Sequence, residues 1–186
     1  MAVPAVQRFG YGFLQGVDAA AKELGLVGDI KVEYVYGNQF FGDADITAVM
    51  DTWYGEKGVE CVFACGGGIF TSAAEAAAKV GGKVIGVDVD QAAIIDGAYG
   101  EGMTVTSAMK GLAPATIDTL VDVVINGNWA NYAGKIDTLG LVSGDDASLN
   151  YVQIPTTTLF VDGQFAAADY KALVKGMFDG TITVSA

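Results

Sequence analysis

A run of three glycines, Gly66–Gly68, is the first group of residues in this chain that could do chemistry. Glycines placed between an apolar run and a helix let the backbone turn tightly and approach a ligand, and the free amides of the helix attract anions. The spacing Gly66-x-Gly68-x-x-Thr71, with Asp88 20 residues after Gly68, nearly matches the dinucleotide-binding fingerprint. However, Thr71 replaces the third glycine and a complete βα unit precedes this one. A dinucleotide site and a plain structural turn both remain open.

Two carboxylates, Asp88 and Asp90, close the apolar run VIGV. The alternation of side chains along a strand predicts that both lie on the same side, beyond the end of the strand. A carboxylate there could accept hydrogen bonds from vicinal hydroxyls, act as a general acid or base, or bind Mg²⁺. A helix cap or a solvated turn is the ordinary alternative. Because no further cluster of acids is near, we expect no metal site.

Phe40 and Phe41 are adjacent in the loop GNQFFGD. One ring could stack on a flat ligand, or the pair could fill a gap in the core beneath the loop. Lys110 follows the alternating run MTVTSAM. A lone lysine is usually a surface charge, but the end of this strand could face the same cleft as Asp88.

The elements that must position these residues follow from the periodicity of the apolar side chains. We predict strands at 29–36, 60–65, 83–87 and 103–108, with weaker ones at 139–142, 151–154 and 159–161. Helices are predicted from Pro4 to about residue 24, and at about 44–56, 72–80, 112–125 and 167–178. Three consecutive βα units predict an α/β fold, a three-layer sandwich around a mainly parallel sheet.

Two details of the helices carry further expectations. Gly12, Gly16 and Ala20 form a stripe of small residues on the first helix, and we expect it to pack closely against the sheet. Ser72 and Glu75 have the spacing of a capping box, which predicts that Ser72 caps the third helix.

The composition excludes several classes of function. The chain has 186 residues, is 52% hydrophobic and carries a net charge of -12 without a basic run, which argues against nucleic acid as a partner. It has no histidine, so a Cys-His zinc site and a His-based triad are excluded. Cys61 and Cys65 would lie about 13 Å apart in one strand, too far to pair, and we expect both to be buried. The opening MAVPAVQRFGYGF does not resemble a signal peptide, and we find no apolar run long enough to cross a membrane.

Several stretches, in this order, resemble the BMP family of basic membrane lipoproteins, the substrate-binding components of nucleoside ABC importers. They are RFGYGFLQG, NQFFGD, FACGGGIFTSAAEAA, VIGVDVDQ, TSAMKG and the terminal DGQFAAADYKALVKGMFDGTITVS. The resemblance spans nearly the whole chain. GVDVDQ with the downstream TSxxK is the most specific part, whereas the glycine run alone is not specific.

The resemblance implies a type I periplasmic-binding-protein-like lobe that binds a nucleoside, with a purine base expected, and that is not an enzyme and needs no cofactor. It implies that Phe40 or Phe41 stacks on the base, that Gly66, Gly67 and Gly68 lie against the ligand, that Asp88 takes the ribose hydroxyls and that Lys110 lies close by. The implied partners are the nucleoside and the permease, and the implied location is extracytoplasmic, on a lipoprotein anchored to the cell membrane. A nucleotide-dependent Rossmann-like enzyme and a flavodoxin-like regulatory domain are the alternatives.

The chain begins where the second lobe of the family begins, so residues 1–186 are expected to form a single domain, the C-terminal lobe. With the first lobe missing, we expect this chain to bind a nucleoside weakly or not at all. The helix at 112–125 would lie near or beyond the hinge in two-lobed binding proteins, and its apolar face would be free to form a homodimer.

Overall fold

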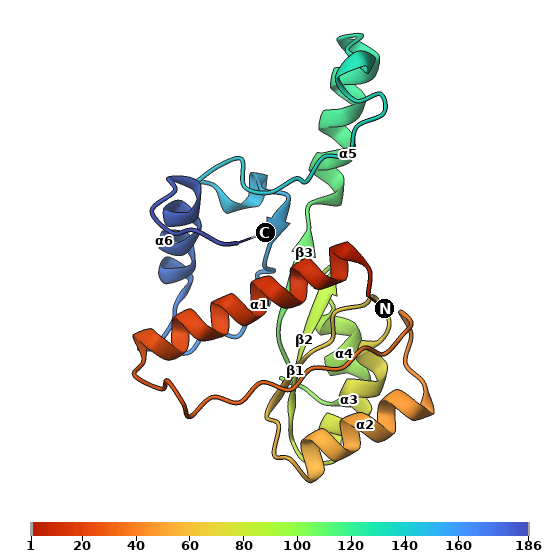
Figure 1. Cartoon of the computed structure of the whole chain (residues 1–186), viewed down its shortest axis with the longest axis vertical. Coiled ribbons are helices and arrows are strands. Elements are labelled where there is room, and N and C mark those ends of the chain that lie inside the picture. The colour runs from red at the N-terminus through yellow and green to blue at the C-terminus, as the bar shows by residue number, and fades with distance from the viewer. Residues whose placement is uncertain (1, 186) are drawn as a thin grey trace. The chain divides into compact units, whose positions relative to one another are not determined.

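The structure, a computed structural model, describes residues 2–185 and divides them into two compact units (Figure 1). The first unit contains the residues up to Ser107, the short piece Thr157–Leu159 and the end of the chain from Val184. The second contains Ala108–Thr156 and Phe160–Thr183. Each unit is described by itself.

The first unit alternates helices and strands in the order that its hydrophobic pattern predicts. Its elements are α1 (Pro4–Glu23), α2 (Ala44–Gly55), β1 (Cys61–Phe63), α3 (Phe70–Ala78), β2 (Lys83–Asp88), α4 (Ala92–Tyr99) and β3 (Thr104–Lys110), the last of which continues into the second unit. Strands β1 and β2 are parallel, with Cys61 opposite Lys83. The sheet order is β1-β2-β3-β4, and only the β3–β4 pairing is described as antiparallel.

Helices cover both faces of this sheet, as β1 shows. Val62 is buried in the core with α2 and α3, whereas the next residue, Phe63, points to the other face and contacts the ring of Phe13 from α1 at 5.1 Å between centroids. The alternation of a strand thus places one side chain in each layer. The predicted α/β fold with a mostly parallel sheet between helices is confirmed.

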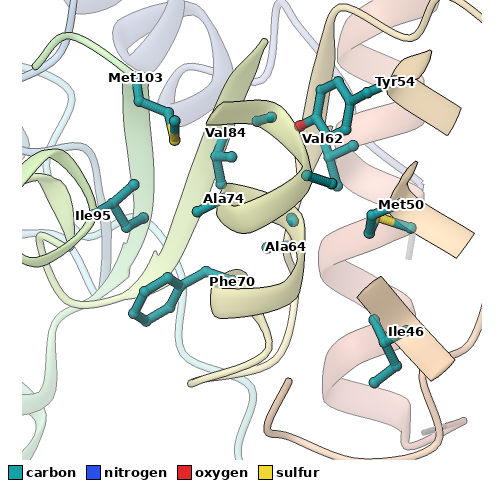
Figure 2. Packing of buried hydrophobic residues seen from close by; sticks show 13 residues of the cluster. Ile46, Met50, Tyr54, Val62, Ala64, Phe70, Ala74, Val84, Ile95 and Met103 are labelled. Atoms are coloured by element: carbon teal, nitrogen blue, oxygen red, sulfur yellow. The ribbon is translucent and has the colours of Figure 1, made fainter. Parts of the chain in front are cut away.

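The core of the first unit lies between α2, α3, α4 and the sheet (Figure 2). Helix α3 contributes four alanines to it, and these small side chains let the helix approach β2 and α2 closely. Tyr54 closes one end: its hydroxyl donates to the carbonyl of Lys83 at 2.6 Å, and burial raises the pKa of its phenol above the ordinary value. The buried members are Ile46, Met50, Tyr54, Val62, Ala64, Phe70, Ala73, Ala74, Ala76, Ala77, Val84, Ile95 and Met103.

The second unit begins at the end of β3 and contains a helical arm, a short strand and a final helix. The arm is α5 (Leu112–Leu120), continued by the π-helical turn η1 (Val121–Ile125) and the short helix η2 (Trp129–Asn131). The remaining elements are η3 (Ala147–Leu149), β4 (Val152–Gln153) and α6 (Ala167–Phe178). Asn150 is fully buried and organises the loop before β4, where its side chain accepts from the amides of Val142 and Ser143.

The predicted strand at 29–36 is the largest error of the sequence analysis, because the structure has no strand there. The segment contacts α1 instead: Gln7 donates to the hydroxyl of Tyr36, and the ring of Tyr34 lies against Gly10. Its apolar side chains stay exposed, Tyr34 at 61%. The alternation favoured a strand, but a strand also needs a neighbour, and the paired part of β1 is only three residues long.

Smaller differences concern helix α4, two other elements and the cysteines. Helix α4 was not predicted, because Gly97 and its short length hide the helical period. Residues 139–142 form no strand. Residues 159–161 also form none, although the amide of Leu159 donates to the carbonyl of Val105 in β3 and Val161 forms an isolated bridge with Phe165. The expectation that both cysteines are buried is wrong: Cys61, in the edge strand β1, is exposed, and Cys65, beyond the end of β1, is half-buried. No helix of the described residues is long and apolar enough to cross a membrane.

Gly12 and Gly16 of α1 do not pack closely, contrary to expectation. A methyl group added at Gly12 or Gly16 would meet no atom within 4 Å. We therefore expect Gly16→Ala to raise the free energy of unfolding by about 1 kcal/mol, since alanine has the higher helix propensity. Urea denaturation measures this change. Gly82→Ala is the contrasting variant: its methyl group would lie 2.5 Å from the Tyr54 ring and should lower stability. Destabilisation by Gly16→Ala would contradict the open packing of α1.

Candidate functional site

The glycine run forms a tight turn between β1 and α3. Gly67 has φ 55°, a left-handed conformation that glycine adopts without strain. The amide of Gly66 donates to the carbonyl of Ala64, and the amide of Ile69 donates to the carbonyl of Gly66. The chain thus reverses at the end of β1 and enters α3 directly.

The loop with the two phenylalanines lies against this turn. Phe41 forms an isolated parallel bridge with Gly68. A methyl group on Gly68 would lie 3.1 Å from Cδ1 of Phe41, and one on Gly66 would lie 3.5 Å from Cδ1 of Phe40. Both residues are exposed, Phe40 at 38% and Phe41 at 71%. They therefore do not plug the core, and a flat ligand can reach them.

The loop is fixed to α3 by the hydroxyl of Ser72, a residue that is 2% exposed. The amide of Asp43 donates to this hydroxyl at 3.0 Å, and the hydroxyl of Thr47 lies at the same distance. The predicted capping box is therefore wrong: α3 begins at Phe70, and Ser72 lies inside the helix, where it binds the loop. Gly42 makes this contact sterically feasible, because a methyl group there would lie 2.9 Å from the backbone nitrogen of Ser72.

This packing also weighs against the dinucleotide alternative. In that motif the pyrophosphate lies on the free amides at the start of the helix. Here Gly42 and Asp43 occupy the space beside the first turn of α3, and the hydroxyl of Thr71 donates to the carbonyl of Gly68. Thr71, which replaces the third glycine of the fingerprint, thus closes the turn rather than opening it to phosphate.

Asp88 lies at the end of β2 in a strained conformation. Its φ of 72° is left-handed, and the amide of Val89 donates to the carbonyl of Val87 at 2.9 Å. These features define a γ-turn centred on Asp88, of the rarer and more strained form. The Oδ1 atom of Asp88 is buried. Strained residues that persist often lie at functional sites, so the turn supports Asp88 as a binding residue.

Asp90 has a structural role, and it does not share the strand alternation of Asp88. Strand β2 ends at Asp88, and the γ-turn redirects the chain before Asp90. Its carboxylate accepts from the amide of Ala92 at 3.1 Å, at the start of α4, and from the hydroxyl of Thr157 at 2.9 Å. Because the N-cap of α4 is Gln91, without a side-chain cap, this bond makes an Asx turn before the helix, so of the two ordinary alternatives the turn fits Asp90 and the helix cap does not.

Gln91 joins the glycine turn to the Asp88 turn, and the sequence analysis did not single it out. Its Nε2 donates to the carbonyl of Gly67, and its Oε1 accepts from the amide of Val87, each at 2.9 Å. The only signal was its place at the end of GVDVDQ, where a glutamine before a helix would usually face solvent. The fold instead leaves it 6% exposed.

Lys110 is the last residue of β3 and pairs with Val152 of β4 in the second unit. Its place beside Asp88 stays a prediction. The first unit thus brings together Phe40, Phe41, the glycine turn and Asp88. Among the residues that the structure describes, no group of three or more Asp, Glu or Cys side chains could hold a metal ion.

The comparison with protein families agrees with these motifs. The model of the Bmp family, described as ABC transporter substrate-binding protein PnrA-like, matches residues 1–145 of this chain. A comparison with curated proteins found no significant match. The matched range contains all of the site residues named above, from Phe40 to Lys110, and it covers more than half of the chain. The chain therefore belongs to the Bmp family of PnrA-like ABC transporter substrate-binding proteins.

Proposed function

We propose that this chain binds a nucleoside with a purine base for an ABC importer. The observation that supports this proposal is the connected wall in the first unit: Phe41 is bridged to Gly68, and Gln91 ties Gly67 to the Asp88 turn. The exposed rings and the strained turn that carries the Asp88 carboxylate are thus both hydrogen-bonded, directly or through Gln91, to one glycine turn. The base would stack on Phe40 or Phe41, and the ribose hydroxyls would donate to Asp88.

The chemistry of the wall suits a nucleoside better than a free sugar or an anion. A planar base gains stacking energy on an exposed ring, and a carboxylate accepts two hydrogen bonds from a vicinal diol. The glycine turn lets the flat ligand approach the backbone, and we propose that Lys110 completes the polar contacts. A negatively charged phosphate would be repelled by Asp88, and Gly42 lies against the first turn of α3 where it would bind.

The Bmp family is a solute-binding, non-enzymatic family that works outside the cytoplasm with ABC transporter components. For this chain we propose binding without turnover, no cofactor, and delivery of the nucleoside to a permease. We further propose that residues 1–186 correspond to the C-terminal lobe of a two-lobed lipoprotein anchored to the cell membrane. A nucleoside that stays intact after long incubation with the chain would support the non-enzymatic role.

The proposed function is tested by titrating the ¹⁵N-labelled 186-residue chain with adenosine, ribose and NAD, followed by NMR. Because Phe40 and Phe41 are exposed, we expect weak binding, with a Kd on the order of 1 mM. Adenosine should shift the amides of Gly67 and Asp88, whereas ribose should not. Stronger shifts with NAD would favour the dinucleotide-dependent enzyme. The absence of any shift at this wall would contradict nucleoside binding.

We also propose that the arm formed by α5 and η1 joins two copies of the chain. None of its residues is buried, and Ile117, Leu120, Val121 and Val124 recur at the spacing of one helix face. A helix of this length is marginal in water unless an apolar face is covered.

The acids of the arm favour a second copy as the covering partner. Asp118 accepts from the hydroxyl of Tyr151, and Asp122 accepts from the side chains of Asn126 and Asn128, which lowers the pKa of the Asp122 carboxyl. Both acids are thus held beside the apolar face rather than on it. Two such faces can meet without burying a charge.

Sedimentation at rising concentration should show a monomer–dimer equilibrium, which salt should strengthen because the net charge of -12 opposes association. Leu120→Lys should abolish the dimer, since it places a cation on the apolar face. Thr119→Lys, one residue away on the other face, should leave the dimer intact. A sedimentation coefficient that is independent of concentration in the wild type would refute this interface.

A further inference from the structure

Gln91 is buried, and its side chain uses both ends of its amide. The residue is 6% exposed, although glutamine is mostly found at the surface. The amide of Val87 can only donate and the carbonyl of Gly67 can only accept, so the neighbours fix which end is oxygen and which is nitrogen. The backbone amide of Gln91 donates to the hydroxyl of Ser107 at 3.1 Å, and Ser107 is fully buried on β3.

The two groups that Gln91 holds both adjoin left-handed residues. Gly67 itself has φ 55°, and Val87 precedes Asp88, which has φ 72°. A strained γ-turn of this kind persists only where the surroundings over-determine it. The hydrogen bond from Val87 to Gln91 fixes the residue before the turn, and the bond from Gln91 to Gly67 ties that turn to the glycine run.

The sequence makes room for this bridge at Gly86. A methyl group at this position would lie 2.7 Å from Oγ of Ser107, 2.8 Å from Oε1 of Gln91 and 3.0 Å from its Cβ. The φ of Gly86 is not in the left-handed region, so its glycine is needed for space and not for conformation. Three residues of the run GVDVDQ therefore act together. Gly86 leaves space for the side chain of Gln91, and Gln91 holds the strained turn at Asp88.

We propose that Gln91 is a positioning residue that sets the distance and orientation of the Asp88 turn relative to the glycine turn. It acts through these two turns, since both ends of its amide are bonded to the backbone, and not by touching the ligand. This inference rests on the proposed function for its effect on nucleoside binding. Its structural part, the fixing of the turn, is testable without ligand.

The experiment compares Gln91→Met, Gln91→Glu and the wild type by amide hydrogen exchange and by NMR titration with adenosine. Methionine has nearly the same volume but cannot form either bond. In Gln91→Met the amides of Val87 and Val89 should exchange at least about tenfold faster, while those of Val84 and Ile95 in the core keep their rates. The affinity for adenosine should fall by about tenfold. Gln164→Met, at an exposed glutamine before α6, is the matched control and should change neither readout.

Gln91→Glu gives a second readout that general destabilisation would not produce. An ionised glutamate still accepts from Val87 but repels the carbonyl of Gly67, whereas a protonated one can donate to that carbonyl. Its affinity for adenosine, relative to the wild type at the same pH, should therefore recover as the pH is lowered through the pKa of the new carboxyl.

The outcomes separate this inference from the proposed function. The inference is supported if Gln91→Met exchanges faster only at the amides of Val87 and Val89 and binds adenosine more weakly, and if the affinity of Gln91→Glu recovers at low pH. Uniformly faster exchange across the core, or unchanged exchange at the turn, overturns it. Unchanged affinity in spite of a mobile turn overturns it as well. If the wild type binds no adenosine, the proposed function fails, and the exchange pattern alone decides whether Gln91 fixes the turn.

Discussion

Ile95→Ala should lower the free energy of unfolding by about 2–5 kcal/mol. Ile95 is fully buried between α4 and the sheet, in the cluster that includes Val84 and Met103 (Figure 2). Truncation removes buried methyl groups and leaves a cavity that the surrounding side chains fill only in part. Urea denaturation followed by circular dichroism measures the change.

Ile94→Ala provides the matched control, because Ile94 is the adjacent residue on the same helix and is 59% exposed. It should change the free energy of unfolding by less than about 0.5 kcal/mol. Equal effects of the two substitutions would show that α4 does not pack as described. The comparison also tests the helix that the sequence analysis missed.

Asp88→Asn should weaken adenosine binding by about tenfold to a hundredfold, because a carboxylate accepts stronger hydrogen bonds from ribose hydroxyls than an amide does. Stability should change little, since asparagine has the same shape as aspartate and bears the same strain at the φ of 72°. NMR titration measures the affinity, and urea denaturation measures the stability. A stable Asp88→Asn variant with wild-type affinity would remove Asp88 from the site.

Asp90→Asn is the control for this prediction. Asp90 lies two residues away and binds the amide of Ala92 and the hydroxyl of Thr157, both of which an asparagine can still satisfy. Its affinity for adenosine should stay that of the wild type. Weaker binding of adenosine by Asp90→Asn than by Asp88→Asn would contradict this assignment and indicate that Asp90 binds the ribose hydroxyls.

Local patterns predicted most of the fold of the first unit. Pro4 set the start of α1, and apolar periodicity located α2, β1, β2 and β3 to within a few residues. The prediction of a strand at 29–36 was wrong because alternation shows only that a segment is able to pair with a sheet edge. Whether it does pair depends on a partner strand that is distant in the sequence. Helix α4 was missed because it is short and contains Gly97.

The site residues were found in part, for a similar physical reason. Glycines, adjacent phenylalanines and a strand-end aspartate are unusual residues in their local context, so the sequence exposed them. Gln91 is ordinary in its context, and its importance arises only when the fold brings Gly67, Val87 and Ser107 around it. Ser72 was assigned to a helix cap on its spacing, whereas its burial beneath the Phe40–Phe41 loop decides its partners.

Intermolecular NOEs between adenosine and the chain test the central claim most directly. The account predicts contacts from the base protons to the rings of Phe40 or Phe41, and from the ribose protons to Cβ protons of Asp88, in the same complex. It also predicts that both sets disappear in Asp88→Asn while the core signals remain. Binding of adenosine with NOEs to other residues, and none to this wall, would contradict the account.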